Sequence, residues 1–354
     1  MTEPVLEVDN LQVTFPTADG DVLAVRGVSF DLRPGEVLGI VGESGSGKSV
    51  TSLAVMGLLP RTAQLSGSVK FQGDALLGRS EKQMMPVRGR GIAMIFQDPM
   101  TSLNPVYKIG WQIIEAIQAH QDVDKGKARE IAIDLLTRVG IPNPTERIDS
   151  YPHEFSGGMR QRVVIAIAMA NDPDIILADE PTTALDVTVQ AQVLESLRSA
   201  LEVTHASLLL ITHDLGVVAG IADSVIVMYG GRVVERGQVD DVFYTPAMPY
   251  TSGLLASLPR LDSDGSERLR PIPGSPPAMV DLPPGCPFAP RCPLSTDICH
   301  EVEPALVAVG GGSVEDRTAH LAACHFAEDV FAGTVGPIFA ATSEDLEDAG
   351  VEAG

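Results

Sequence analysis

The feature that most constrains this chain is a glycine-rich loop between an apolar run and a helical pattern. The loop, residues 42–49, reads Gly-Glu-Ser-Gly-Ser-Gly-Lys-Ser and fits the phosphate-loop pattern G-x-x-x-x-G-K-[ST] at every required position. Its backbone N–H groups can point at phosphate oxygens, Lys48 can reach the β and γ phosphates, and the Ser49 hydroxyl can ligate Mg²⁺. Because Val37–Val41 predicts a strand before the loop and residues 49–59 a helix after it, we expect a nucleotide site here. The residues assigned to it are Gly42, Glu43, Ser44, Gly45, Ser46, Gly47, Lys48, Ser49 and Val50.

An acidic pair follows a second apolar run. Ile175–Ala178 predicts a buried strand, and Asp179 and Glu180 come directly after it. A carboxylate at a strand end can hold magnesium through water, and its neighbour can position the attacking water near the γ phosphate. We therefore predict Asp179 as a Mg²⁺ residue beside Ser49, and Glu180 as the catalytic base.

A third segment predicts a helix start that could bind an anion. Residues 155–161 read Phe-Ser-Gly-Gly-Met-Arg-Gln and precede the apolar stretch 163–170. Ser156 predicts an N-cap, and the glycines after it leave free N–H donors at a positive helix end. An ordinary helix start explains the same residues, and the residues alone leave both readings open.

Charge and hydropathy narrow the class of protein. A formal charge of -22 argues against nucleic acid as the partner. The longest apolar stretches fall short of the roughly 20 residues that cross a bilayer. The N-terminus, Met-Thr-Glu-Pro, lacks the basic residues and apolar run of a secretory signal, so we expect a cytoplasmic protein.

The pattern along the chain predicts an α/β fold with an added segment. Alternating residues near the N-terminus predict an antiparallel β subdomain, and apolar spacing from about 100 to 165 predicts an inserted helical subdomain. Strand signals then return between helical stretches, as in a parallel sheet covered by helices. We expect an ATPase domain over 1–258, a small irregular extension over 259–327, and a flexible acidic tail over 328–354.

Taken together, these motifs resemble the P-loop ATPase domain of ATP-binding cassette (ABC) proteins. Ser-Gly-Gly-Met-Arg-Gln between this phosphate loop and this Asp-Glu pair is similar to the family signature. The resemblance implies a Q-loop at Gln97 that contacts Mg²⁺, a D-loop over residues 184–186, and a catalytic switch histidine, His213, that contacts the γ phosphate and senses its loss. It also implies that the phosphate loop of one subunit and the signature of another clamp the same ATP. The implied nucleotide-contacting residues outside the loop are Phe15, Gln97, Ser156, Gly157, Gly158, Gln161, Asp179 and Asp186.

The segments after residue 243 resemble the extension of dipeptide and oligopeptide importer ATPases. They are residues 244–251, 272–277 and 286–293. The resemblance implies a subunit on the cytoplasmic face of the membrane, working with two permease subunits, a second related ATPase and an extracytoplasmic peptide-binding protein. Import of nickel or another small solute is the alternative, followed by a soluble cassette ATPase without a transport role.

Four cysteines, Cys286, Cys292, Cys299 and Cys324, lie together in this extension. In a reducing cytosol such a cluster favours metal over disulfides, and four thiolates suit either tetrahedral zinc or a [4Fe-4S] cluster. Resemblance to relatives with this extension favours the iron-sulfur cluster, with zinc as the alternative and free thiols behind both. His300 and His325, each beside a cysteine, are reserve ligands.

Overall fold

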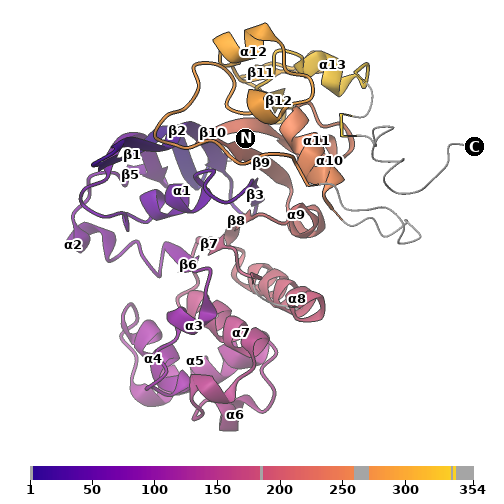
Figure 1. The fold of residues 1–354 in the computed structure, drawn as a ribbon. Helices are drawn as coiled ribbons and strands as arrows, with labels where there is room; N and C mark the ends of the chain where they lie inside the picture. The colour runs from indigo at the N-terminus through magenta and orange to yellow at the C-terminus, as the bar shows by residue number, and fades with distance from the viewer. Residues whose placement is uncertain (1–2, 184–185, 259–270, 336–337, 340–354) are drawn as a thin grey trace, which may run out of the picture.

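The computed structural model describes residues 3–183, 186–258, 271–335 and 338–339. Figure 1 shows a lobe that carries the sheets, with a smaller helical lobe below it and the C-terminal segments above it. The strands are β1 (Leu6–Thr17), β2 (Gly20–Leu32), β3 (Val37–Val41), β4 (Gln64–Phe71), β5 (Asp74–Ala75), β6 (Ile92–Ile95), β7 (Ile175–Asp179), β8 (Ser207–Thr212), β9 (Ser224–Tyr229), β10 (Arg232–Gln238), β11 (Val307–Ala308) and β12 (Leu321–Ala322). The helices are α1 (Lys48–Val55), α2 (Glu81–Met84), α3 (Pro99–Ser102), α4 (Ile109–Gln118), α5 (Lys125–Arg138), α6 (Pro144–Arg147), α7 (Gly157–Ala168), α8 (Val187–Thr204), α9 (Leu215–Ile221), α10 (Val239–Tyr244), α11 (Pro249–Ala256), α12 (Asp297–Glu301) and α13 (Ala327–Phe331), with 3-10 turns at Pro152–Glu154 and Ala289–Arg291.

The larger sheet has the order β11-β12-β10-β9-β3-β8-β7-β6. Its members from β9 to β6 pair in parallel, and β3 lies between β9 and β8. Both faces are covered, which explains why these strands are nearly continuous apolar runs. Along β8, Leu209 and Ile211 join one core cluster and Leu208 and Leu210 the other, as the two-residue repeat of a strand requires. The predicted α/β class is confirmed.

The N-terminal strands form a second sheet of order β2-β1-β4-β5, paired antiparallel throughout. Strand β1 buries alternate residues, including Leu6, Val8 and Val13, in the cluster shared with the larger sheet. Antiparallel sheets commonly bury one face and expose the other, which is the alternation that the sequence shows.

The helical lobe is formed by α3 to α7, between β6 and β7 (Figure 1). On α4, Ile109, Ile113 and Ile117 recur every four residues and are fully buried, so one face of the helix packs on α5 and α7. Each such side chain contributes on the order of 2 kcal/mol by leaving water.

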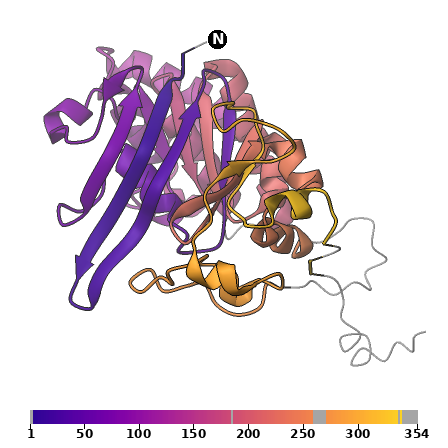
Figure 2. The same ribbon diagram turned by 90° about the horizontal axis from the view of Figure 1, so that it is seen from above.

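The C-terminal extension is more regular than we expected. Its strand β12 pairs with β10, where Glu235 opposes Ala322 and Arg236 opposes Leu321, and β11 pairs with β12. Figure 2 shows the extension lying beside β2 and the edge of the larger sheet. It therefore adds an edge to the larger sheet.

The acidic end also differs from expectation near its start. Residues 327–331 form α13, in which Ala327 and Val330 are buried, and Phe331 and Phe339 pack against the core. These apolar side chains give the first part of the segment something to bury. The remainder of the predicted tail, 340–354, lies outside the described residues. Among the residues that are described, no helix is both long and apolar enough to cross a membrane.

Candidate nucleotide-binding site

The phosphate loop joins β3 to α1, as predicted. Gly42 and Gly47 have φ angles of +151° and +100°, which side chains rarely tolerate. A Cβ on Gly42 would also overlap the carbonyl of Met228, and one on Gly47 the carbonyl of Ala24. At these two positions the path of the backbone requires glycine.

Lys48 lies folded over this loop and is buried. Its Nζ donates to the carbonyl oxygens of Gly42 at 2.7 Å and Glu43 at 2.9 Å. Burial lowers the pKa of Lys48, against the attraction of the Glu180 and Asp179 charges. A phosphate would give this ammonium a charged partner in place of neutral carbonyls.

Ser49 and Asp179 meet across the sheet. The Ser49 hydroxyl donates to Asp179 Oδ1 at 2.9 Å, although the two residues come from different strand ends. Asp179 is 6% exposed, and this burial raises its carboxyl pKa. A hydroxyl and a desolvated carboxylate in contact are oxygen ligands suited to Mg²⁺.

Glu180 is held by three other side chains. Its Oε2 accepts from Gln97 Nε2 at 2.9 Å and from Thr183 Oγ1 at 2.8 Å, and His213 Nδ1 lies 3.3 Å from Oε1. Its backbone is left-handed at φ 48°, a conformation uncommon outside glycine, and its N–H donates to the Ile211 carbonyl at 2.7 Å. The structure thus brings together Gln97, Glu180 and His213, far apart in sequence, around one carboxylate.

The signature helix α7 starts where the sequence places it. Ser156 is the N-cap and accepts from the Met159 N–H at 3.4 Å. A Cβ on Gly158 would overlap Val189 of α8, so glycine permits the close approach of the two helices. Gln161 is buried, and both its side-chain polar atoms lack partners among the described residues. In Figure 1, α7 lies in the helical lobe, apart from α1, which follows the phosphate loop in the lobe that carries the sheets.

Two further residues predicted to contact nucleotide, Phe15 and Asp186, make contacts within the fold itself. Phe15 is partly buried on β1 and packs against the core between the sheets. Asp186 caps α8, and its Oδ1 accepts from the Val189 N–H at 3.0 Å. The other predicted D-loop residues, Ala184 and Leu185, lie outside the described residues.

The four cysteines line one cavity, together with His325 and Phe326. All four are free. Burial raises the pKa of Cys292 to about 11 and that of Cys324 to about 12. In the described chain no three His, Cys, Asp or Glu side chains are arranged to hold a single metal ion. His325 Nε2 donates to the Val302 carbonyl oxygen at 2.9 Å, and Nε2 of the other reserve ligand, His300, lies 3.0 Å from the Ser295 hydroxyl.

Backbone N–H groups point at three of these sulfurs. Cys286 accepts from Phe288 and Ala289, Cys292 from Leu294, and Cys324 from Phe326, the last at 3.3 Å. Such bonds stabilise thiolates and are a means of tuning sulfur-ligated clusters. Four cysteine sulfurs around one cavity are a donor set of the kind that zinc and iron-sulfur clusters both use.

The sequence did not indicate several residues around the site. Thr183 lies in the segment Glu-Pro-Thr-Thr after β7, so its closeness to Glu180 could have suggested the contact. The Tyr250 hydroxyl accepts a hydrogen bond from the Glu43 N–H of the loop at 2.8 Å, and Arg291 pairs with the Glu43 carboxylate. No local pattern links these two residues to the loop.

Comparison with known proteins agrees with this geometry. The profile of the family described as ABC transporter matches residues 25–183, and that described as Oligopeptide/dipeptide transporter, C-terminal region, matches residues 234–299. The chain is 55% identical over 304 residues to the dipeptide transport ATP-binding protein DppD of Bacillus subtilis, covering 85% of this chain and 90% of that one. It is 54% identical over 342 residues to the oligopeptide transport ATP-binding protein OppD of Mycobacterium tuberculosis, covering 96% of this chain and 55% of that one. The chain thus spans about half the length of the mycobacterial relatives.

A solved structure shares the fold of the cassette. It is the dimeric post-hydrolysis state of the ATP-binding cassette MJ0796 bound to ADP and Pi, with a TM-score of 0.59 and 25% identity over 66% of this chain and 98% of that one. The shared fold, the two matched profiles and the identity to relatives along most of their length lead to one assignment. The chain belongs to the ATP-binding cassette transporter family, among the ATP-binding proteins that carry the oligopeptide/dipeptide transporter C-terminal region.

Proposed function

We propose that this chain is the ATP-binding and ATP-hydrolysing subunit of an importer of dipeptides or oligopeptides. The observation that carries the proposal lies at the end of β7. There Ser49 contacts Asp179, and Gln97 and His213 both contact the carboxylate of Glu180. The peptide cargo rests on relatives named for dipeptide and oligopeptide transport and on the matched C-terminal region.

In the proposed reaction the chain's own groups supply binding and proton transfer. The loop N–H groups and Lys48 hold the phosphates, and Ser49 and Asp179, with Gln97, hold Mg²⁺. Glu180 accepts the proton of the attacking water. The contacts of its carboxylate with Gln97 and Thr183 keep that carboxylate oriented. His213, more than half exposed at 57% of its side chain, is free to reach the γ phosphate.

The second half of the site comes from another subunit in this proposal. Ser156, Gly157 and Gly158 of one ATPase face the nucleotide held on the loop of the other, and Asp186 lies near the same interface. The other ATPase is a related subunit or a second copy of this chain. The complex further comprises two permease subunits and an extracytoplasmic peptide-binding protein, and the chain works at the cytoplasmic face of the membrane.

For the cysteine cavity we propose a [4Fe-4S] cluster held by Cys286, Cys292, Cys299 and Cys324. Support comes from four sulfurs around one cavity, three of them hydrogen-bonded by backbone N–H groups. Zinc is the alternative. Anaerobically purified protein should absorb near 400 nm and contain about four irons per chain. Colourless protein that contains one zinc per chain would contradict the iron-sulfur cluster and assign the cavity to zinc.

Co-purification of the complex tests the proposed function. The tagged chain should bring down permease subunits, and ATP hydrolysis by the reconstituted complex should rise with the binding protein and a peptide. Stimulation by nickel or another small solute, with no response to peptides, would favour the second candidate. A soluble ATPase that associates with no permease would contradict a role in transport.

A further inference from the structure

The C-terminal extension reaches the phosphate loop through one arginine. Arg291 lies in the 3-10 turn Ala289–Arg291, and only 4% of its side chain is exposed. Its guanidinium binds the carboxylate of Glu43 in a bidentate pair, with N–O distances of 2.5 Å and 2.9 Å. Such fork-shaped pairs fix geometry as well as charge. Two segments 248 residues apart are thereby joined inside the nucleotide site.

Every polar group of Glu43 is engaged. Its N–H donates to the Tyr250 hydroxyl at 2.8 Å, its carbonyl accepts from Lys48 at 2.9 Å, and its carboxylate is taken by Arg291. The second residue of the loop is thus fixed by its main chain and its side chain at once. The phosphate-loop pattern requires no particular residue at this position, so the pattern does not account for the pair.

The surroundings of Arg291 hold it rigidly. Its Nε donates to the Pro273 carbonyl at 2.9 Å, and one terminal nitrogen donates to the Tyr229 hydroxyl at 3.2 Å. The guanidinium also lies 5.8 Å from the ring centres of Tyr229 and Phe288. Since these contacts come from β9 and from the extension, the side chain is placed before any nucleotide binds.

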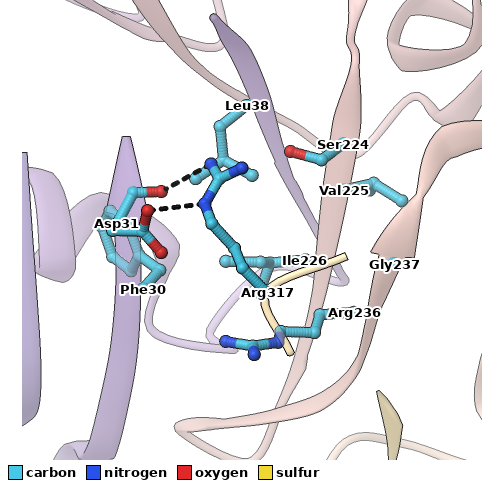
Figure 3. Close-up of a pocket in the computed structure, with 9 residues that line it drawn as sticks. All are labelled: Phe30, Asp31, Leu38, Ser224, Val225, Ile226, Arg236, Gly237 and Arg317. Carbon is cyan, nitrogen blue, oxygen red and sulfur yellow. Dashed lines mark hydrogen bonds and ion pairs between the residues drawn. The ribbon is translucent and has the colours of Figure 1, made fainter. Parts of the chain in front are cut away.

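A second ion pair of the extension provides a comparison. Arg317 donates to Asp31 at 2.5 Å and also pairs with Glu36, as Figure 3 shows for Asp31. Asp31 and Glu36 precede β3, whereas Glu43 follows it. Arg317 therefore fastens the extension at the opposite end of the strand from the nucleotide.

We propose that Arg291 is a positioning residue of the phosphate loop, so that the extension forms part of the nucleotide-binding machinery. The loop binds phosphate only when its successive N–H groups converge, and an unanchored glycine-rich loop must order itself on binding. Arg291 removes part of that ordering cost by holding Glu43. The inference rests on the proposed nucleotide site.

The test is a double-mutant cycle on nucleotide affinity in the full chain. The dissociation constant of a non-hydrolysable ATP analogue with Mg²⁺ is measured by calorimetry for Arg291→Met, Glu43→Gln and the double variant. Each single change should weaken binding about 2- to 30-fold. The double variant should bind no more weakly than whichever single variant has the larger dissociation constant. The control Arg317→Met should lower the melting temperature and shift the dissociation constant less than about twofold.

Two outcomes separate the inference from its basis. Wild-type affinity in Arg291→Met, with loss of binding in Lys48→Met, would show that Arg291 only fastens the extension. Unchanged binding in Lys48→Met would instead overturn the nucleotide site itself. If Arg291→Met fails to fold, Arg291→Lys keeps the charge without the fork and Glu43→Gln keeps the shape, and wild-type affinity in both contradicts the inference.

Discussion

Replacement of Glu180 by glutamine isolates its proposed role as a base. The wild-type carboxylate accepts from Gln97 and Thr183 through Oε2 and faces His213 through Oε1. The glutamine oxygen can keep the first two bonds, and its amide can face the imidazole, so little packing or hydrogen bonding is lost. What disappears is the ability to accept a proton from water.

The expected effect is therefore large on hydrolysis and small on binding. A positioned general base contributes about 10²- to 10⁴-fold, or about 3 to 5 kcal/mol of the barrier. Glu180→Gln should lose at least about 100-fold in phosphate release from the reconstituted complex. Its affinity for an ATP analogue should stay within about threefold, because Lys48 and the loop N–H groups are untouched. Light scattering should also detect an ATP-bound dimer that persists longer than in the parent.

A matched control uses an exposed carboxylate outside the site. Glu195 on α8 has a side chain that is 71% exposed, and Glu195→Gln should hydrolyse ATP at the parental rate. Phosphate release by Glu180→Gln at that same rate would refute the assignment of the base.

Three other changes test separate parts of the account. Asp179→Asn should raise the melting temperature of the nucleotide-free protein at neutral pH and abolish Mg²⁺-dependent hydrolysis. Burial raises the pKa of Asp179, so its ionised carboxylate destabilises the fold, and that penalty is lost as the pH falls through the raised pKa. An unchanged or lower melting temperature at neutral pH would contradict it. Gly158→Val should cost about 1 to 3 kcal/mol in denaturant unfolding, since the side chain would overlap Val189, and parental stability would show that the helices can separate cheaply. Phe15→Ala should weaken ATP binding by about 1 to 3 kcal/mol, because the family resemblance puts this ring in the place of the aromatic that stacks on adenine, and equal affinity in calorimetry would contradict that role.

The central sheet was predictable because its signals are local. The all-apolar run Val37–Val41 needs both faces covered, and the loop after it must begin a helix if its N–H groups are to converge. The acidic pair at the end of β7 was predictable for the same reason, because it directly follows an apolar run. The order of the strands, with β3 between β8 and β9, depends on pairing between distant segments and has no local signal.

The extension was the least predictable part. Its strand β12 is two residues long and joins the sheet only because β10 offers an open edge. The burial of Val330 and Phe331 likewise depends on a surface supplied by earlier segments, so composition alone suggested a tail with nothing to bury. The contact of Arg291 with Glu43 joins residues 248 positions apart in the sequence and could be found only in the structure.

The residues of the nucleotide site differed in how far the sequence alone could predict them. Ser49, Asp179 and Glu180 follow from motifs whose chemistry is explicit. Gln97 and His213 entered through resemblance to a family, and the structure shows why they belong beside Glu180: each contacts its carboxylate. Their roles in catalysis stay predictions until variants are assayed.

Lys48 provides the most direct measurement, because its buried ammonium lies in the phosphate loop itself, where it donates to the carbonyl oxygens of Gly42 and Glu43. ATP hydrolysis by the reconstituted complex should fall about 10²- to 10³-fold in Lys48→Met, with circular dichroism unchanged. A variant that turns over ATP as fast as the parent would mean that the triphosphate is held elsewhere.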